Sequence, residues 1–113
     1  MATHRLVVFT QPKPGQEAEY NRWYEEVHLG DVLKVEGFVA AQRFEVATAQ
    51  IGDAAQAAPA RYLAIYEIEA ENLEAALAQL SAGSDSMEIS DALDAGQAQA
   101  IAFTAIGERK LSS

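Results

Sequence analysis

Two strand-like segments of this sequence are apolar at nearly every position, so neither face of a sheet built from them would be polar. Residues 6–10 carry no charge, and residues 62–68 carry only Glu67. An antiparallel sheet with helices on one face normally presents polar side chains to water on the other. The second face of this sheet therefore needs a cover of its own.

A second copy of the chain is the simplest such cover. A contiguous apolar patch of this extent is either an association surface or an aggregation liability. With 113 residues, the chain has few left over from which its own loops could build a lid. The same face of another copy, related by a twofold axis, would bury both patches at once. We therefore expect a homodimer.

The predicted elements follow one another in the order β-α-β-β-α-β. β-branched and aromatic residues indicate the strands, acidic residues in the first turn indicate the first helix, and Asn72 as an N-cap begins the second helix. This order is the split arrangement of ferredoxin-like folds, so we expect an α+β protein with a four-stranded antiparallel sheet, in a single domain of residues 1–113. The predicted strands cover residues 6–10, 38–46, 62–68 and 100–106; the predicted helices cover residues 16–30 and 73–82; loops fill 47–60 and 84–96.

Charge and composition exclude several kinds of partner. The net charge is -9 and the pI is near 4.5, without the clustered Lys and Arg that nucleic acid or an anionic membrane surface requires. The absence of cysteine excludes a disulfide framework and a thiolate nucleophile. The first apolar run, residues 6–9, is too short for a signal peptide or a membrane span, so we expect a cytoplasmic protein.

Three segments resemble the EthD-like branch of the dimeric α+β barrel superfamily. They read WYEEVH at residues 23–28, VEGFVAAQRF at 35–44 and RYLAIYE at 61–67. The resemblance implies two sheets packed back to back, with a pocket in each protomer between sheet and helices. The family often has proline two residues after the histidine, where this chain has Gly30. Its members include polyketide cyclases, lactone isomerases and cofactor-free oxygenases, so the fold alone selects no reaction.

His28 is the leading candidate for chemistry. Near neutral pH an imidazole both accepts and donates protons, which isomerisation, cyclisation and C–H abstraction beside a carbonyl require. The sequence predicts it at the end of the first helix, where the helix dipole favours the protonated ring and Asp31 is close enough to orient it. The alternative is a structural histidine that caps the last carbonyls of the helix.

Aromatic residues precede this histidine at helical spacing. Tyr24 lies one turn before His28, so both side chains can face the same space. Tyr24 and Trp23 would line a pocket for a flat molecule, with the phenol donating to a carbonyl or enolate oxygen. The alternative is that the stripe only packs the helix on the sheet.

Tyr66 and Arg43 each have two interpretations, and His4 has one. The hydroxyl of Tyr66 enters the pocket if its side of the strand faces the helices, and otherwise lies in the dimer interface. Arg43 either binds a carboxylate substrate or pairs with Glu45, Glu67 or the partner subunit. His4, near the start of the chain, is expected to be solvated.

The residues favour chemistry without a cofactor, or no chemistry. Two separated histidines without cysteines form no metal ligand set, and no glycine-rich phosphate loop or nucleophile elbow is present. Our hypothesis is a small cofactor-independent lyase, isomerase or cyclase that moves protons on an apolar, aromatic or polyketide-like molecule. The alternatives are a cofactor-free monooxygenase, a non-catalytic hydrophobic-ligand-binding or stress-associated dimer, and a subunit with a collapsed pocket. The candidate catalytic residues are His28, Asp31, Tyr24 and Tyr66, and the candidate substrate-binding residues are Trp23, Phe38, Phe44 and Arg43.

Overall fold

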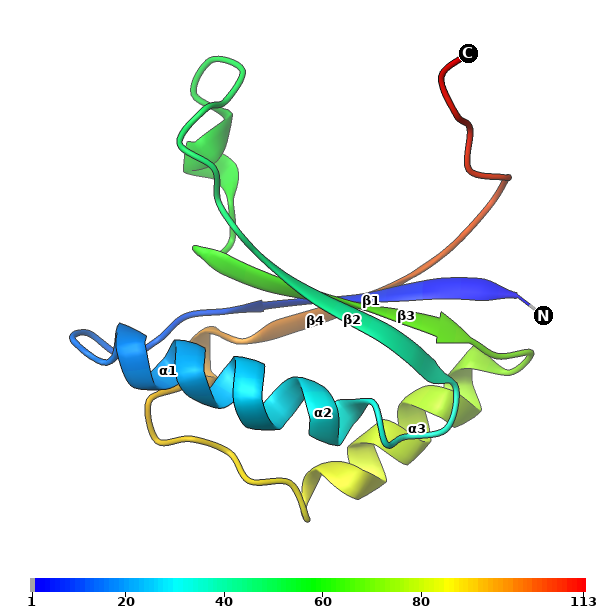
Figure 1. Ribbon diagram of the computed structural model, residues 1–113, viewed down its shortest axis with the longest axis horizontal. Coiled ribbons are helices and arrows are strands. Elements are labelled where there is room, and N and C mark those ends of the chain that lie inside the picture. The colour runs from blue at the N-terminus through cyan, green and yellow to red at the C-terminus, as the bar shows by residue number, and fades with distance from the viewer. Residues whose placement is uncertain (1) are drawn as a thin grey trace.

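A four-stranded antiparallel sheet with helices on one face only organises the molecule, as the computed structural model of residues 2–113 shows (Figure 1). The strand order is β2-β3-β1-β4, with the chain's first and third strands at the centre. This is the ferredoxin-like α+β fold predicted from the element order. The strands are β1 (Thr3–Thr10), β2 (Phe38–Glu45), β3 (Tyr62–Glu69) and β4 (Gln99–Thr104).

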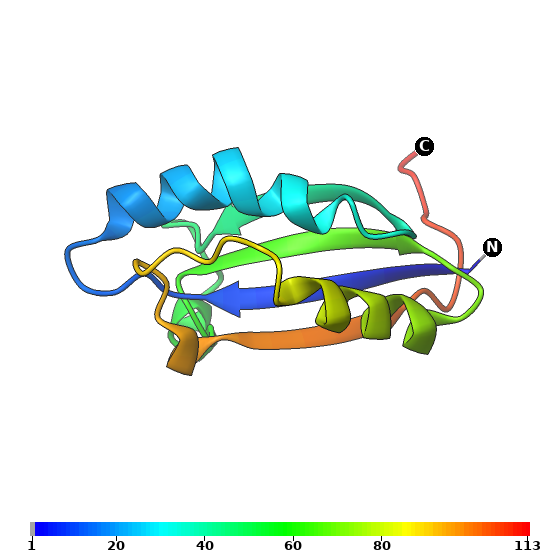
Figure 2. The same cartoon turned by 90° about the horizontal axis from the view of Figure 1, so that it is seen from below.

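Two helical stretches cross the same face of the sheet (Figure 2). The first is continuous but has three parts: α1 (Glu17–Trp23), a π-helical turn η1 (Tyr24–His28), and α2 (Leu29–Val32). It ends two residues later than the sequence predicts. The second is α3 (Leu73–Ser84), where the Asn72 side chain accepts a hydrogen bond from the Ala75 amide at 3.0 Å, as expected of an N-cap. Short 3-10 turns, η2 (Ala54–Ala57) and η3 (Ala95–Gln97), lie in the loops, and no helix within residues 2–113 is long and apolar enough to cross a membrane.

Alternation along the central strands decides which side chains enter the core. In β3 every second residue from Tyr62 to Ile68 is buried under the helices. This register turns the ring of Tyr66 towards the helices and settles the question that the sequence left open. The largest fully buried side chains are Trp23, Tyr20, Tyr24, Tyr66 and Ile68.

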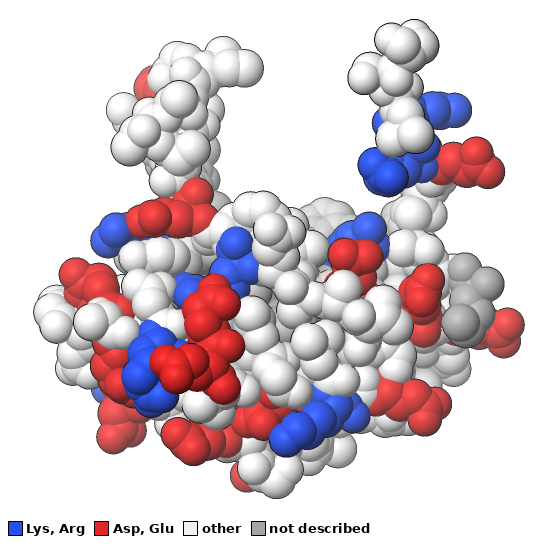
Figure 3. Space-filling view, in the orientation of Figure 1, with Lys and Arg blue, Asp and Glu red and all other residues white. Residues whose placement is uncertain are grey.

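The other face of the sheet is largely apolar and no helix covers it, as the residue pattern predicts. Phe44, Ile101 and Phe103 are 43%, 44% and 53% exposed, and the strand register places them on the side away from the helices. Residues 47–60 and 105–113 rise from the sheet on this side as two arms (Figure 1), and the surface between them is mostly uncharged, with a few charged side chains near the bases of the arms (Figure 3). We call this patch the open face; it consists of Val7, Phe9, Phe44, Leu63, Ile65, Ile101 and Phe103.

His4 is buried, so the prediction that it is solvated is wrong. Its Nδ1 lies 2.9 Å from Thr104 Oγ1 and its Nε2 lies 3.2 Å from the Ala70 carbonyl oxygen. The reason is that β1 begins at Thr3 rather than at residue 6, so His4 falls on the helix-covered face. Two hydrogen bonds compensate for burial of the ring.

Candidate active site

A small apolar cavity lies on the helix-covered side of the sheet. Its volume is about 190 Å³, and every layer of the fold contributes to its wall: three strands, η1, α2, α3 and the loop after α3. No Asp, Glu, Lys or Arg lines it. The Ser84 hydroxyl donates to the Ser81 carbonyl oxygen at 2.7 Å, which leaves two polar side chains of interest. The lining residues are Leu6, Val8, His28, Val32, Tyr66, Leu80, Ser84, Met87, Ile89 and Ala100.

Those two side chains, His28 and Tyr66, each carry a buried polar atom without a hydrogen-bond partner. The atoms are Nδ1 of His28 and Oη of Tyr66, and no other side-chain nitrogen or oxygen that is buried in residues 2–113 lacks a partner. Leaving a buried donor or acceptor unpaired costs about 1–3 kcal/mol. Such groups are rare in folded proteins and often mark function. Both residues line one cavity, so a ligand bound there would lie beside them.

The π-helical turn brings His28 to its place. In a regular α-helix, residues five apart point about 140° away from each other. The wider turn over Tyr24–His28 reduces this separation, and the rings of Trp23 and His28 stack with centroids 4.6 Å apart and planes at 24°. The Tyr24 ring meets His28 edge-on at 5.1 Å. The imidazole is thus held between two aromatic rings, and π turns of this kind occur frequently at functional sites.

Burial sets the protonation of the site. It lowers the pKa of His28 below the ordinary 6.5, and the nearby Asp31 charge offsets this only in part. Burial also raises the pKa of Tyr66, and the neighbouring Tyr24 phenol adds to the effect. At neutral pH the site therefore holds a neutral imidazole, able to accept a proton, and a neutral phenol, able to donate a hydrogen bond.

Asp31 is not hydrogen-bonded to the imidazole. Its carboxylate lies 3.5 Å from Lys34 Nζ instead, at the surface beyond the cavity. The helix continues to Val32, so His28 does not sit at a helix end, and the expectation that the dipole favours its protonated form is wrong. Asp31 acts on the ring only through its charge. Within residues 2–113, no three His, Asp or Glu side chains are placed to hold a metal ion.

Trp23 and Phe38 stand behind the two polar residues rather than in the cavity wall. Trp23 is fully buried, and its Nε1 donates to the Glu88 carbonyl oxygen at 2.7 Å. This bond ties the loop that carries Met87 and Ile89 to the first helical stretch. Phe38 is buried and meets the Tyr66 ring edge-on at 6.4 Å. Both residues position the site.

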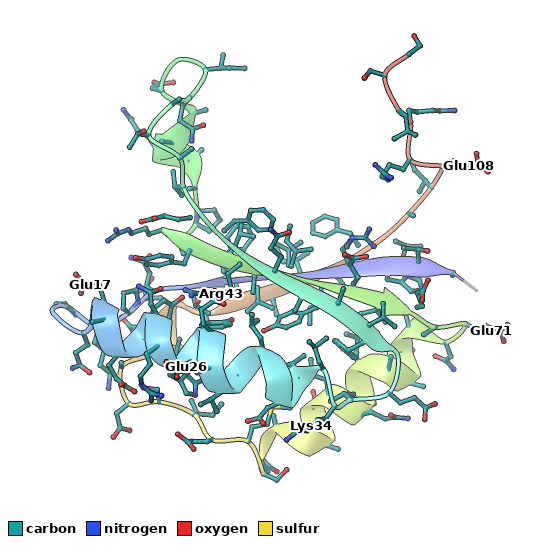
Figure 4. All side chains as sticks on the ribbon, in the orientation of Figure 1. Glu17, Glu26, Lys34, Arg43, Glu71 and Glu108 are labelled. Carbon is teal, nitrogen blue, oxygen red and sulfur yellow. The ribbon has the colours of Figure 1, made fainter. Side chains whose placement is uncertain are left out.

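Arg43 and Phe44 lie away from the cavity. The Arg43 guanidinium is nearly enclosed between α1 and the sheet (Figure 4), with its carbon 4.7 Å from the Tyr24 ring centroid. It donates to Asn21 Oδ1 at 2.7 Å and to Glu25 Oε1 at 3.2 Å, not to the two glutamates that the sequence suggested. Those two glutamates pair with other arginines. Phe44, the next residue, belongs to the open face.

Sequence reasoning missed most of the apolar wall. Val32 and Leu80 come from the facing helical stretches, and Met87 and Ile89 come from the loop that closes the cavity. The signal for Met87 and Ile89 was present, since two apolar residues in a Ser- and Asp-rich segment need something to pack against. Nothing in residue spacing indicated the π turn.

Two solved structures share this fold. A crystal structure of an EthD family protein from Bacillus halodurans C-125 matches with a TM-score of 0.58 at 15% identity, over 97% of this chain and 100% of that chain. HapK from Hahella chejuensis matches with a TM-score of 0.55 at 12% identity, over 100% of both chains. No protein-family model and no curated protein matches the sequence. The resemblance to EthD-like proteins therefore holds at the level of fold.

The unpaired Tyr66 hydroxyl makes a prediction about stability. Because a buried hydroxyl without a partner is unfavourable, Tyr66→Phe should leave the free energy of unfolding unchanged or raise it by about 1 kcal/mol. Tyr20→Phe is the matched control, since the Tyr20 hydroxyl is hydrogen-bonded to the buried Thr10 hydroxyl and its removal should cost about 1–2 kcal/mol. Urea unfolding measures both. Equal losses would mean that the Tyr66 hydroxyl has a partner in the folded protein.

The lowered pKa of His28 makes a prediction about pH. Because the folded protein binds the His28 proton less tightly than the unfolded chain, the neutral ring's contribution to stability is complete above pH 6.5 and is lost as pH falls towards the folded pKa. The free energy of unfolding should thus fall less steeply for His28→Gln than for the wild type between about pH 7 and about pH 5. The chain has two histidines, so proton NMR can follow each ring directly. A His28 pKa above 6.5 would contradict the assignment.

Proposed function

We propose that the protein moves a proton on a small apolar molecule bound in the His28 cavity, as a cofactor-independent isomerase, lyase or cyclase. The observation that carries the proposal is the pair of buried, unpartnered polar atoms, His28 Nδ1 and Tyr66 Oη, on residues that line one apolar cavity. Stability alone does not favour this arrangement, because each unpaired atom costs free energy. The oxygen of a bound carbonyl compound would accept from the Tyr66 hydroxyl, and the C–H group next to the carbonyl would lie against His28 Nδ1.

The chemistry follows from the protonation states. The neutral His28 imidazole takes a proton from a carbon next to a carbonyl group, and the electron pair of the broken C–H bond moves towards the carbonyl oxygen. The Tyr66 hydroxyl donates a hydrogen bond to that oxygen as negative charge develops. The imidazolium then returns the proton to the oxygen or to another carbon of the same molecule. Protons and electrons balance without a further reactant.

The surroundings support these roles. Trp23 and Tyr24 hold the imidazole between their rings, which limits the orientations it can adopt. The charge of Asp31 favours the imidazolium that forms during transfer, although the two groups are not in contact. The apolar wall keeps the hydrogen bond of Tyr66 strong by excluding water.

A non-catalytic ligand-binding protein is the second candidate. The observation that favours it is the missing hydrogen bond between Asp31 and His28, since enzymes that use a histidine base usually orient it with such a partner. The two candidates share the cavity and differ only in whether a proton moves. Proton exchange therefore separates them.

We further propose that two copies associate through the open face. Large apolar side chains stay exposed there, and the arms at 47–60 and 105–113 rise on either side of it (Figure 1). The arms themselves carry exposed apolar residues, Ile51 at 93%, Ile106 at 103% and Leu111 at 75%, which a second copy would cover. Association on this side leaves the cavity, on the other side of the sheet, free to bind its ligand.

Deuterium exchange tests the proton-transfer proposal without knowledge of the natural substrate. Cyclohexanone in D₂O should exchange the protons next to its carbonyl faster with the wild-type protein than without it, as followed by proton NMR. His28→Gln should lower the catalysed rate by about a hundredfold or more, and Tyr66→Phe should lower it as well.

Glu26→Gln serves as the control for the exchange experiment and should leave the rate unchanged, because Glu26 lies in the same helical turn as His28 but is exposed. Oxygen consumption during exchange would instead indicate a monooxygenase. Binding of the ketone without catalysed exchange would leave the non-catalytic candidate.

Light scattering after size-exclusion chromatography tests the association. The wild type should have twice the mass of one chain, and Phe103→Glu should reduce it to one, because a carboxylate would be buried in the apolar interface. Leu33→Glu is the matched control, since Leu33 is an exposed apolar residue just after α2, on the helix-covered side. A monomeric wild type, or a dimer that only Leu33→Glu disrupts, would contradict the proposal.

A further inference from the structure

The dimensions and polarity of the cavity also restrict what it can hold, given the function proposed above. We infer that the ligand is a neutral molecule with a single ring and one oxygen substituent, either a cyclic ketone or the corresponding enol or phenol. Three properties of the site lead to this class: its volume, the absence of charge in its wall, and the number of its unpartnered polar atoms.

The volume of the cavity suits a ligand with one ring. A cavity of about 150 Å³ lined by aliphatic and aromatic side chains is known to hold a benzene molecule. This cavity, at about 190 Å³, is larger by about 40 Å³, little more than the ~30 Å³ that one water molecule occupies. Pockets for drug-sized ligands begin near 300 Å³. A benzene ring with one or two further heavy atoms fits the space, whereas a fused polycyclic molecule would extend out of its open side.

The wall selects a neutral ligand. No cationic side chain lines the cavity, and burial keeps the His28 ring neutral, so a carboxylate would be buried without a counter-charge. Arg43, the nearest guanidinium to Tyr24, already donates to Asn21 and Glu25 outside the cavity. Carboxylate ligands are therefore disfavoured.

The two unpartnered polar atoms of the site favour a ligand with one oxygen atom. His28 Nδ1 and Tyr66 Oη are the two unpartnered atoms, and one ligand oxygen can serve both. A ligand hydroxyl donates to the unprotonated Nδ1 and accepts from the tyrosine, whereas the oxygen of a ketone accepts from the tyrosine and its neighbouring C–H group lies against the unprotonated Nδ1. A ketone and its enol are also the two ends of the proton transfer proposed above. A second polar substituent would lie against the apolar wall and lose its hydration.

Binding of four probes tests the inference. Dissociation constants for para-cresol, toluene, para-toluate and the three-ring phenol phenanthrol are measured by NMR shift titration of the full chain. Para-cresol should bind about tenfold more tightly than toluene, because it satisfies the buried polar atoms. Para-toluate and phenanthrol should not displace it. Tyr66→Phe should reduce the difference between para-cresol and toluene.

Two substitutions in β4 locate the binding. Ala100 lines the cavity and is exposed enough to accept a larger side chain, so Ala100→Phe should abolish para-cresol binding. Gln99→Phe, the adjacent residue on the opposite side of the sheet, should leave it unchanged and controls for binding to the open face. Equal affinity for toluene and para-cresol, tighter binding of phenanthrol or para-toluate, or loss of binding in Gln99→Phe alone would overturn the inference.

The binding experiment and the exchange experiment can fail independently of each other. Tight para-cresol binding without proton exchange would support the ligand class and refute the enzyme. Exchange that depends on His28, together with preference for a larger or charged ligand, would support the enzyme and refute the ligand class.

Discussion

The wide helical turn at Tyr24–His28 is the feature on which the site depends. It lets the rings of Trp23 and His28 stack although the two residues are five apart. These two side chains reach different layers of the fold. Trp23 holds the loop after α3 through the Glu88 carbonyl, and His28 faces the cavity that this loop closes. A regular α-helix through the same residues would separate the two rings and turn His28 away from Trp23.

The same helical stretch also accommodates a nearly buried cation. Arg43 is stable in the core because three tyrosine rings surround its guanidinium, with centroids 4.7 to 5.6 Å away, and because Asn21 and Glu25 accept its hydrogen bonds. Its positive charge opposes, but does not outweigh, the effect of burial that raises the pKa values of Tyr24 and Tyr66. The tyrosines thus link a charged cluster at one end of α1 to an uncharged cavity at the other.

Much of this arrangement is readable in the sequence, and its limits have physical causes. The order of the elements predicted the fold, and the apolar residues at nearly every strand position predicted the uncovered apolar face. Helical spacing placed Tyr24 beside His28 because four residues make about one turn in either type of helix. Because both sets of alternate strand residues are apolar, the sequence could not show which set faces the helices. The strand register was needed to show that Tyr66 points towards the helices and Phe44 away from them. The position of the Asp31 carboxylate also needed the structure, because spacing along the helix did not show that it lies 3.5 Å from Lys34 Nζ.

The two faces of the sheet are both largely apolar but differ in what surrounds their side chains. On the covered face, apolar residues surround two polar atoms that folding leaves unpaired. This arrangement lowers stability, and a ligand that hydrogen-bonds to these atoms would offset the loss. On the open face, apolar residues remain in water, which is reasonable only if another molecule covers them. Since β1 and β3 contribute alternate side chains to both faces, a shift of either strand by one residue would exchange the two sets. The register of the central strands therefore fixes the cavity and the open face together.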